Sequence, residues 1–508
     1  MLQKPSSTPD DQPIFGAIAD SPLYKLINPD SIAFFGASNR FESMGTSQLS
    51  SLLSLGFQGR VYPVHPKEST VLGLKAYPQV AHLPETPDLA VLILPTRIVL
   101  ETLTQCGKKG IKNAIIVSGG FQEVGAQGSD LQDQLIQLAR RYNIRFLGPN
   151  CLGVANPHRQ LNTTFLPYMG EAGFLGMVSQ SGSFITQMFD YLSRFGMGFS
   201  TAISVGNEAD IDLTEGLKYL AACPHTRVIT LYIETIRNPQ AFMKAASVIT
   251  REKPIIAYYV GGSAAGKQAS LSHTAALSGP DRVYEGVFKQ TGIIRAGSIE
   301  EMFDIAAILG RIPPPEGDRV VIQTHSGGPG AVAADACDRS GLQVPPMPDD
   351  IKKELAELVP HTGSIGNPVD ITFSKDRLAY FTRIPACLPS GNHFDILLIY
   401  LLLPKTMFVR VMKNMGVPEA QIESETIKMI DELSENISKM VLTHGKPVVG
   451  FTFHSEEASF IKRLQANNFP VMPSPHRAAR AVAAVCRYAA WRKGRHAPEG
   501  YPEHSSSV

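Results

Sequence analysis

The sequence predicts an α/β protein with three doubly wound domains, each built on a parallel β-sheet. Short apolar runs alternate along the chain with segments of helical periodicity, which is typical of βαβ units. The 508 residues exceed what one hydrophobic core holds and suit about three domains of 100–200 residues each. We expect polar tails at 1–21 and 494–508, with domains over 22–152, 153–316 and 317–493.

The composition excludes several classes of partner. Lys and Arg number 47 against 46 Asp and Glu, so a net charge of +1 gives no indication of nucleic acid binding. The six cysteines lie far apart without a CxxC pair, which argues against a zinc site or a disulfide framework and fits a reducing cytoplasm. No apolar run approaches about 18 residues, so we expect no signal peptide or membrane span. The sequence therefore predicts a cytoplasmic protein.

The first domain contains five predicted strands, at Ile32–Phe35, Val61–Val64, Leu89–Leu94, Ala114–Ser118 and Ile144–Leu147. Glycine, proline and serine follow these strands, in Gly36-Ala37-Ser38, Pro63-Val64-His65-Pro66, Pro95-Thr96, Ser118-Gly119-Gly120-Phe121 and Gly148-Pro149-Asn150. Ligands of parallel sheets bind beyond the carboxyl ends of the strands, so these turns predict a Rossmann-like binding edge. Five tight βα turns without a ligand are the alternative interpretation.

The turns do not fit a nicotinamide dinucleotide. The GxGxxG fingerprint is absent, and the second strand ends in His65-Pro66, without a carboxylate to hold a ribose. A glycine turn at a helix N-terminus still suits a phosphate group. A nucleotide-containing ligand other than NAD is therefore the better prediction.

The second domain sends polar groups to one sheet edge. A strand over Gly173–Val178 runs into Ser179-Gln180-Ser181-Gly182-Ser183 and a helix over Phe184–Phe195, a turn that suits an oxyanion or is an ordinary helix cap. Strands over Ser200–Val205 and Val228–Ile233 end in Gly206-Asn207 and Glu234. A strand over Ile255–Val260 leads through Gly261–Lys267 to His273, whose imidazole is either a reactive nitrogen or a surface side chain.

The third domain repeats the βα alternation and predicts a flavodoxin-like lobe. Arg319–Gln323 is a predicted strand that runs into Thr324-His325-Ser326-Gly327-Gly328-Pro329-Gly330. Ile396–Leu403 and Pro447–Phe453 are further strands, and Ala478–Trp491 is a closing helix. A single histidine at a glycine turn is more often structural, so His325 is not among the predicted catalytic residues.

A series of motifs in a characteristic order and spacing extends through most of residues 25–315. They are Gly36-Ala37-Ser38, Tyr62-Pro63-Val64-His65-Pro66, Ser118-Gly119-Gly120-Phe121 with Glu123, Gly148-Pro149-Asn150-Cys151-Leu152-Gly153, Ser179-Gln180-Ser181-Gly182, Gly206-Asn207, Tyr232-Ile233-Glu234 and Ser272-His273-Thr274-Ala275-Ala276-Leu277-Ser278-Gly279. The chain thereby resembles the alpha subunit of the NDP-forming acyl-CoA synthetases, a family that includes succinyl-CoA synthetase and ADP-forming acetyl-CoA synthetase.

The resemblance implies a Rossmann-like CoA-binding domain followed by two flavodoxin-like ligase domains. It implies that acyl-CoA, phosphate and ADP are converted reversibly into a carboxylic acid, CoA and ATP through an acyl phosphate. The phosphorylated histidine would be His273, stabilised by Glu234, with Ser181 and Gly182 as its phosphate cradle. Coenzyme A would bind the turns of the first domain at Gly36, Ala37, Ser38, Pro63, Val64, Pro95, Ser118, Gly119, Gly120, Glu123, Pro149 and Asn150. A bulky residue at Gly36 should block this ligand without unfolding the sheet.

The resemblance also implies a partner chain. The sequence has no Walker A motif and no room after residue 493 for ATP-grasp domains, so an ATP-grasp beta subunit would bind ATP or ADP with Mg in a hetero-oligomer. The chain departs from the family at His65-Pro66, and at Tyr259 and Gly262, where many members have cations. A CoA or acyl-CoA sensor that has lost phosphoryl transfer is therefore the alternative function.

Overall fold

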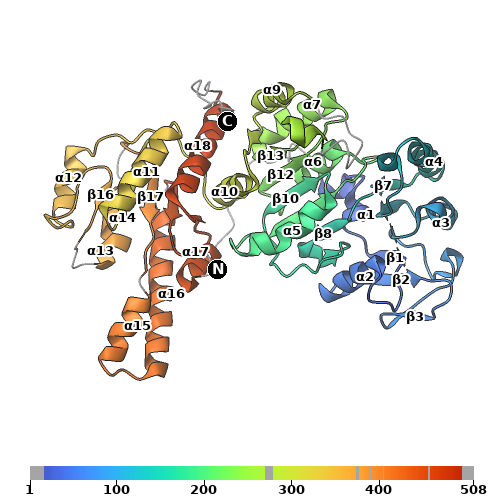
Figure 1. The fold of residues 1–508 in the computed structure, drawn as a ribbon, viewed down its shortest axis with the longest axis horizontal. Coiled ribbons are helices and arrows are strands. Elements are labelled where there is room, and N and C mark those ends of the chain that lie inside the picture. The colour runs from blue at the N-terminus through green and yellow to red at the C-terminus, as the bar shows by residue number, and fades with distance from the viewer. Residues whose placement is uncertain are drawn as a thin grey trace. The chain divides into compact units, whose positions relative to one another are not determined.

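The computed structural model describes residues 16–494 except for 269–278, 373–376, 389–391, 404, 445 and 456–457. The chain divides into two compact units. The first extends to Ser193 and includes Met197–Arg295, whereas the second contains Arg194–Gly196 and everything from Ala296 onward. Both units consist of sheets covered by helices (Figure 1), so the predicted α/β class is confirmed.

The first sheet of unit 1 is parallel throughout. In spatial order its strands are β2 (Arg60–Val64), β1 (Ser31–Phe35), β5 (Leu89–Leu92), β6 (Asn113–Ile116) and β7 (Arg145–Leu147). Its other elements are η1 (Ile18–Asp20), α1 (Tyr24–Ile27), α2 (Met44–Ser54), the hairpin β3 (Thr70–Val71) and β4 (Leu74–Lys75), η2 (Val80–His82), α3 (Thr96–Lys109), η3 (Gln122–Val124) and α4 (Ala126–Tyr142). Every residue of β1 and β5 is buried, as expected for parallel strands covered on both faces.

The second sheet of unit 1 is mixed. In spatial order it contains β14 (Ile294–Arg295), β13 (Ile255–Tyr259), β12 (Val228–Ile233), β10 (Leu175–Ser179), β11 (Phe199–Ser204), β8 (Val154–Asn156) and β9 (Leu161–Asn162). Its helices are η4 (Pro157–Arg159), α5 (Gly182–Ser193), α6 (Leu213–Ala222), α7 (Pro239–Glu252) and α9 (Asp281–Thr291). The prediction of a parallel sheet is correct for β10–β14 and wrong for β8 and β9, which are antiparallel. The η4 connection is too short for a parallel crossover, so the chain returns as a hairpin.

One hydrophobic core joins the two sheets of unit 1. Phe34 and Ile115 from the first sheet belong to the same buried cluster as Val178 and Leu231 from the second. A buried polar contact lies within it, because the amide of Asn28 donates to the Tyr219 hydroxyl at 2.7 Å. The first two α/β domains therefore pack as one body.

Unit 2 contains the third sheet, which is parallel. In spatial order its strands are β16 (Val369–Asp370), β15 (Val320–Thr324), β17 (Ile396–Tyr400), β18 (Val448–Phe451) and β19 (Val471–Met472). Its helices are α10 (Ile299–Leu309), α11 (Gly327–Arg339), α12 (Asp349–Ala356), α13 (Arg377–Phe381), α14 (Arg383–Cys387), α15 (Lys405–Asn414), α16 (Glu419–His444), α17 (Ser459–Ala466) and α18 (Pro475–Arg492). Figure 1 shows α15 folded back beside α16.

Helix α10 belongs to unit 2, although it precedes the boundary that we expected after residue 316. It packs against α18, and the guanidinium of Arg477 donates two hydrogen bonds of 2.7 Å to the buried carboxylate of Asp304. An ion pair with both oxygens bound by one guanidinium fixes orientation as well as distance. This contact explains why the helix groups with the C-terminal elements.

Among the described residues, no helix is both long and apolar enough to cross a membrane. Likewise, the described residues contain no group of three or more His, Cys, Asp or Glu side chains placed to hold a metal ion.

Gly36 follows β1 with φ of +91°, and a Cβ atom there would collide with the backbone carbonyl of Ile93. The expectation that a bulky residue at Gly36 would leave the sheet intact is therefore wrong. The position is occupied by glycine because the β1 and β5 backbones approach each other there, whether or not a ligand binds.

We predict that Gly36→Ala destabilises the protein by about 2–4 kcal/mol, since it adds a steric collision to an unfavourable backbone conformation. Urea denaturation followed by circular dichroism measures this loss as a lower urea concentration at the midpoint of the first unfolding transition. Gly73→Ala is the matched control: Gly73 has φ of +81°, and its Cβ would meet no atom within 4 Å, so only the backbone cost of about 1 kcal/mol should remain. Equal urea midpoints for Gly36→Ala and Gly73→Ala would show that the structure around Gly36 relieves the collision at little cost in stability.

Candidate functional site

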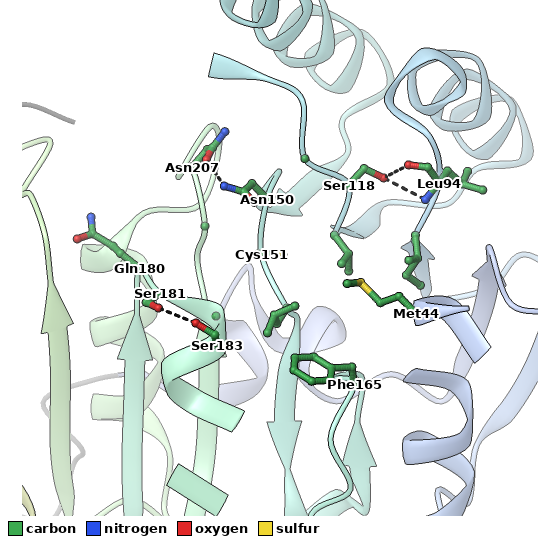
Figure 2. A pocket seen from close by; sticks show the side chains of 16 residues that line it. Met44, Leu94, Ser118, Asn150, Cys151, Phe165, Gln180, Ser181, Ser183 and Asn207 are labelled. Atoms are coloured by element: carbon green, nitrogen blue, oxygen red, sulfur yellow. Dashed lines mark hydrogen bonds between the residues drawn. The ribbon is translucent and has the colours of Figure 1, made fainter. Parts of the chain in front are cut away.

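A cavity of about 550 Å³ lies in unit 1, beyond the carboxyl ends of strands from both sheets. Figure 2 shows its lining side chains. They are Met44, Ile93, Leu94, Val117, Ser118, Gly119, Asn150, Cys151, Leu152, Phe165, Gln180, Ser181, Gly182, Ser183, Gly206 and Asn207. Cavities of about 300–1,000 Å³ are usual for small-molecule sites, so this one is the candidate functional site.

The first sheet supplies the turns after β6 and β7. The Ser118 hydroxyl donates to the Leu94 carbonyl at 2.6 Å and accepts from the Leu94 N–H at 3.1 Å, which ties the β6 turn to the end of β5 (Figure 2). The side-chain amide of Asn150 donates to Asn207 across the cavity wall at 3.3 Å. Both polar residues are thus held in place by neighbouring loops before any ligand binds.

The second sheet supplies the N-terminus of α5. The Ser179 hydroxyl donates to the Ser181 carbonyl at 2.6 Å and accepts from the Ser181 N–H at 3.1 Å, so the turn between β10 and α5 is closed by local bonds. The hydroxyls of Ser181 and Ser183 lie 3.3 Å apart at the cavity (Figure 2). The first N–H groups of a helix lack intrahelical partners and carry a partial positive charge, so this end of the cavity suits an anion.

Five of the predicted ligand-binding residues line the cavity together: Ser118, Gly119, Asn150, Ser181 and Gly182. Two others brace its wall. The Glu123 carboxylate accepts hydrogen bonds from the N–H of Gly120 at 2.5 Å and from the Asn207 amide at 2.5 Å. Glu123 therefore connects the turn after β6 to the loop after β11.

The remaining predicted positions of the first domain do not line this cavity. They are Gly36, Ala37, Ser38, Pro63, Val64, Pro95 and Pro149. The Ala37 side chain is in the core, and the Pro63 carbonyl accepts a hydrogen bond of 2.9 Å from the Tyr77 N–H. A ligand at these positions would meet backbone and turn edges at the ends of β1, β2, β5 and β7, so their assignment to coenzyme A stays a prediction.

The predicted catalytic pair is only half described. Glu234 is buried directly after β12, and its N–H donates to the Gln180 side chain at 2.6 Å. His273 lies outside the described residues. The predicted contact between the Glu234 carboxylate and the imidazole therefore stays a prediction. His325, which was predicted to be structural, stacks on the Tyr380 ring at 3.5 Å in unit 2.

Reasoning from sequence missed the apolar side of the cavity and two of its amides. Met44 and Phe165 line the wall together with Leu152, but neither directly follows a predicted strand, so the search for strand-end turns could not find them. Gln180 and Asn207 belong to the recognised motifs, yet their types alone do not reveal that both residues line the cavity.

Cys151 also lines the cavity, and its chemistry is constrained by burial. Burial raises the pKa of the Cys151 thiol to about 12. A thiol with this pKa is protonated at neutral pH, and only the thiolate is a good nucleophile. Cys151 is therefore a wall residue and not the nucleophile of this site.

The comparisons with known proteins agree with this geometry. Family models for a CoA binding domain, a succinyl-CoA ligase-like flavodoxin domain and a Ligase-CoA domain match residues 30–157, 172–309 and 320–437. The chain is 35% identical over 474 residues to the acetate–CoA ligase (ADP-forming) I subunit alpha of Pyrococcus furiosus, covering 92% of this chain and 98% of that one.

Two further relatives extend the match. The 4-hydroxybutyrate–CoA ligase (ADP-forming) of Nitrosopumilus maritimus is 34% identical over 481 residues, covering 94% of this chain and 65% of the relative. A solved structure of dinucleotide forming acetyl-coenzyme A synthetase 1 from Candidatus Korarchaeum cryptofilum, in complex with phosphate and ADP, superposes with a TM-score of 0.81. It is 32% identical, and the match covers 93% of this chain and 97% of that one. The chain belongs to the NDP-forming acyl-CoA synthetase family and corresponds to its alpha subunit.

Proposed function

We propose that this chain is the CoA-binding and phosphoryl-carrying subunit of an ADP-forming acyl-CoA synthetase. It would convert acyl-CoA, phosphate and ADP reversibly into a carboxylic acid, CoA and ATP. The names of its relatives support the ADP-forming activity, since they include acetate and 4-hydroxybutyrate ligases of that class.

The observation that carries the proposal is the shared cavity. Turns of the CoA-binding domain, with Ser118 and Asn150, line the same space of about 550 Å³ as Ser181 and Gly182 at the start of α5. The first group suits the polar end of a thioester, and the second suits a phosphate. A thioester carbonyl and an attacking phosphate can therefore be held side by side, which is the geometry that acyl phosphate formation needs.

The chemistry follows in two transfers. A phosphate oxygen attacks the thioester carbonyl, the carbon–sulfur bond breaks, and CoA leaves with a proton as an acyl phosphate forms. The neutral imidazole of His273 then attacks the phosphorus in line, the acid departs as a carboxylate, and the phosphoryl group is on the histidine. The N–H groups at the start of α5 would stabilise the phosphoryl oxygens, and Glu234 would stabilise the charged imidazole.

A partner chain completes the reaction in this proposal. The Pyrococcus furiosus relative is named as a subunit alpha, and the Korarchaeum structure was solved with phosphate and ADP. An ATP-grasp beta subunit would bind ADP and Mg and accept the phosphoryl group from His273 in a cytoplasmic hetero-oligomer. The sensor alternative differs because it binds CoA without forming phosphohistidine.

Tyr259, one of the departures from the family, has a structural role that is compatible with both the synthetase and the sensor. The Tyr259 ring stacks on Tyr284 at 3.7 Å, and its hydroxyl donates to the Gly279 carbonyl at 2.9 Å. Tyr259 is thus a core residue that anchors the segment after the His273 loop. At this position a packed aromatic ring stands where many family members have a cation. The substitution is therefore not by itself a sign that phosphoryl transfer has been lost.

We predict that the holoenzyme, incubated with labelled ATP and Mg, gains label on this chain as an acid-labile, base-stable phosphoramidate. His273→Ala should abolish the label, whereas CoA affinity measured by calorimetry should stay unchanged, because the cavity residues are intact. Glu234→Gln should keep the fold and slow labelling by about 10–100-fold, since the imidazolium loses its stabilising charge.

Ser272 and Thr274 are the rival acceptors in the same loop, and Ser272→Ala with Thr274→Ala is the matched control that should label normally. Acid-stable label that persists in His273→Ala would refute the phosphohistidine. CoA binding without any labelling of the wild-type chain would favour the sensor.

We also predict that Cys151 resists alkylation in the native protein. At pH 8 a thiol of pKa about 12 is ionised in only about one molecule in ten thousand. Cys106 is the control, because burial also raises the pKa of its thiol to about 12, and it lies outside the cavity. Mass spectrometry after iodoacetamide treatment should find both unlabelled and the partly exposed Cys387 labelled first. Fast labelling of Cys151 but not of Cys106 would instead identify a reactive thiolate in the cavity.

A further inference from the structure

Glu208 is a buried acid that the proposed reaction does not use. It follows β11 with φ of +53°, and it is 4% exposed. Its carboxylate accepts a hydrogen bond of 2.7 Å from the Leu213 N–H at the start of α6 and one of 2.9 Å from the Gln180 side chain. An unpaired buried charge is costly, so a carboxylate at this depth needs a structural or functional reason.

The Gln180 side chain links Glu208 to the loop that carries Glu234. Its amide nitrogen donates to Glu208 and to the Thr235 carbonyl, at 2.9 and 2.8 Å. Its amide oxygen accepts from the N–H groups of Glu234 and Thr235, at 2.6 and 3.0 Å. Both donor hydrogens and both acceptor positions of the amide are thus used.

This arrangement fixes which way the Gln180 amide points. If the amide were reversed, its nitrogen would face the N–H groups of Glu234 and Thr235, and its oxygen would face the Glu208 carboxylate. Donor would meet donor and acceptor would meet acceptor at every contact. The contact with Glu208 is therefore one of the four that fix the amide orientation, and it is the only one of them made by a side chain.

We propose that Glu208, in its ionised form, is a positioning residue that acts through Gln180 to hold the Glu234 backbone for phosphoryl transfer. The inference rests on the proposed function, because that function assigns Glu234 its role. Glu208 is not itself among the residues that line the cavity, so it acts through Gln180. Gln180 is one of the residues that line the cavity, directly before Ser181 and the start of α5.

The surroundings of Glu208 determine when it is ionised. Arg237, in the loop between β12 and α7, lies 3.4 Å from the carboxylate and also donates to the Asn207 carbonyl at 2.5 Å. Asp212, the N-cap of α6, opposes the negative charge, and Glu123 reaches the adjacent Asn207 from the loop after β6. Burial outweighs the favourable contacts with Gln180, Arg237 and the Leu213 N–H and raises the pKa of Glu208 to about 7.

The sign of the pH effect follows from these donors. Three donors face the two carboxylate oxygens, so a proton on either oxygen puts a fourth donor against them and weakens the hold on Gln180. Because the pKa is raised to about 7, the carboxylate is ionised above this pH and gains a proton as the pH falls through it. The Glu234 loop should therefore be held firmly above about pH 7 and loosened below it.

Hydrogen exchange measured by mass spectrometry on the full chain tests the positioning without requiring catalysis. In the wild type, the peptide that contains Glu234 and Thr235 should be protected at pH 8 and lose protection, after correction for intrinsic rates, below pH 7. Glu208→Gln should reduce this protection at pH 8 by about 10-fold, because its amide group presents a donor to Gln180. Glu215→Gln is the matched control, since Glu215 lies on the same loop–helix segment and instead accepts from Arg145 at 2.8 Å. Equal protection in Glu208→Gln and the wild type would overturn the positioning.

The phosphorylation rate of the holoenzyme tests the functional half. Glu208→Gln should slow labelling of His273 by about 10–100-fold at pH 8 and remove the decline of the wild type below pH 7. Combining it with Glu234→Gln should add little further loss, since both substitutions disable the same contact. The proposal would be contradicted if the two substitutions slowed labelling additively. It would also be contradicted if the labelling rate of Glu208→Gln still declined below pH 7 as in the wild type. If wild-type His273 takes no label at all, the proposed function fails, whereas the exchange measurement still decides the role of Glu208 in the loop.

Discussion

The site depends on a close backbone contact between the loop after β7 and the loop after β11. Gly206 adopts φ of +56°, and a Cβ atom there would lie 2.5 Å from the Pro149 carbonyl oxygen. The next N–H, that of Asn207, donates to the same carbonyl at 2.9 Å. This seam brings the carboxyl edges of the two sheets together, so that Asn150 from one and Ser181 from the other line one cavity.

The cavity is polar, but its lining side chains carry no formal charge. Among the described residues that line it, the polar ones are serines, asparagines and a glutamine, and the ionisable Cys151 is held neutral by burial. Two carboxylates beside the cavity wall, those of Glu123 and Glu208, accept hydrogen bonds from the surrounding loops. An anion would thus be held by N–H dipoles and amides, which depend less on ionic strength than exposed charges do.

The polar residues at the strand ends could be predicted from the sequence, but the residues that pack around them could not. Ser118, Asn150 and Ser181 were predictable because each directly follows an apolar run, and carboxyl ends of parallel strands converge. Phe165 and Met44 were not, since the side of a cavity that is formed by packing has no local pattern. The antiparallel β8–β9 pair escaped prediction for a similar reason: each strand is too short to show a period. The burial of Glu208 depends on loops from three strands and is invisible in its neighbours along the chain.

The pairing of α10 with α18 has a consequence for how the chain is made. Asp304 and Arg477 are 173 residues apart in sequence, so the second unit cannot close its core until the last helix has left the ribosome. The first unit, whose last strand ends at Arg295, is complete much earlier. At roughly 5–20 residues per second, synthesis of Ala296–Val508 takes on the order of 10–40 s. During that interval the face of α10 that packs on α18 has no partner, so we expect this helix to be a segment at which a nascent chain needs a chaperone.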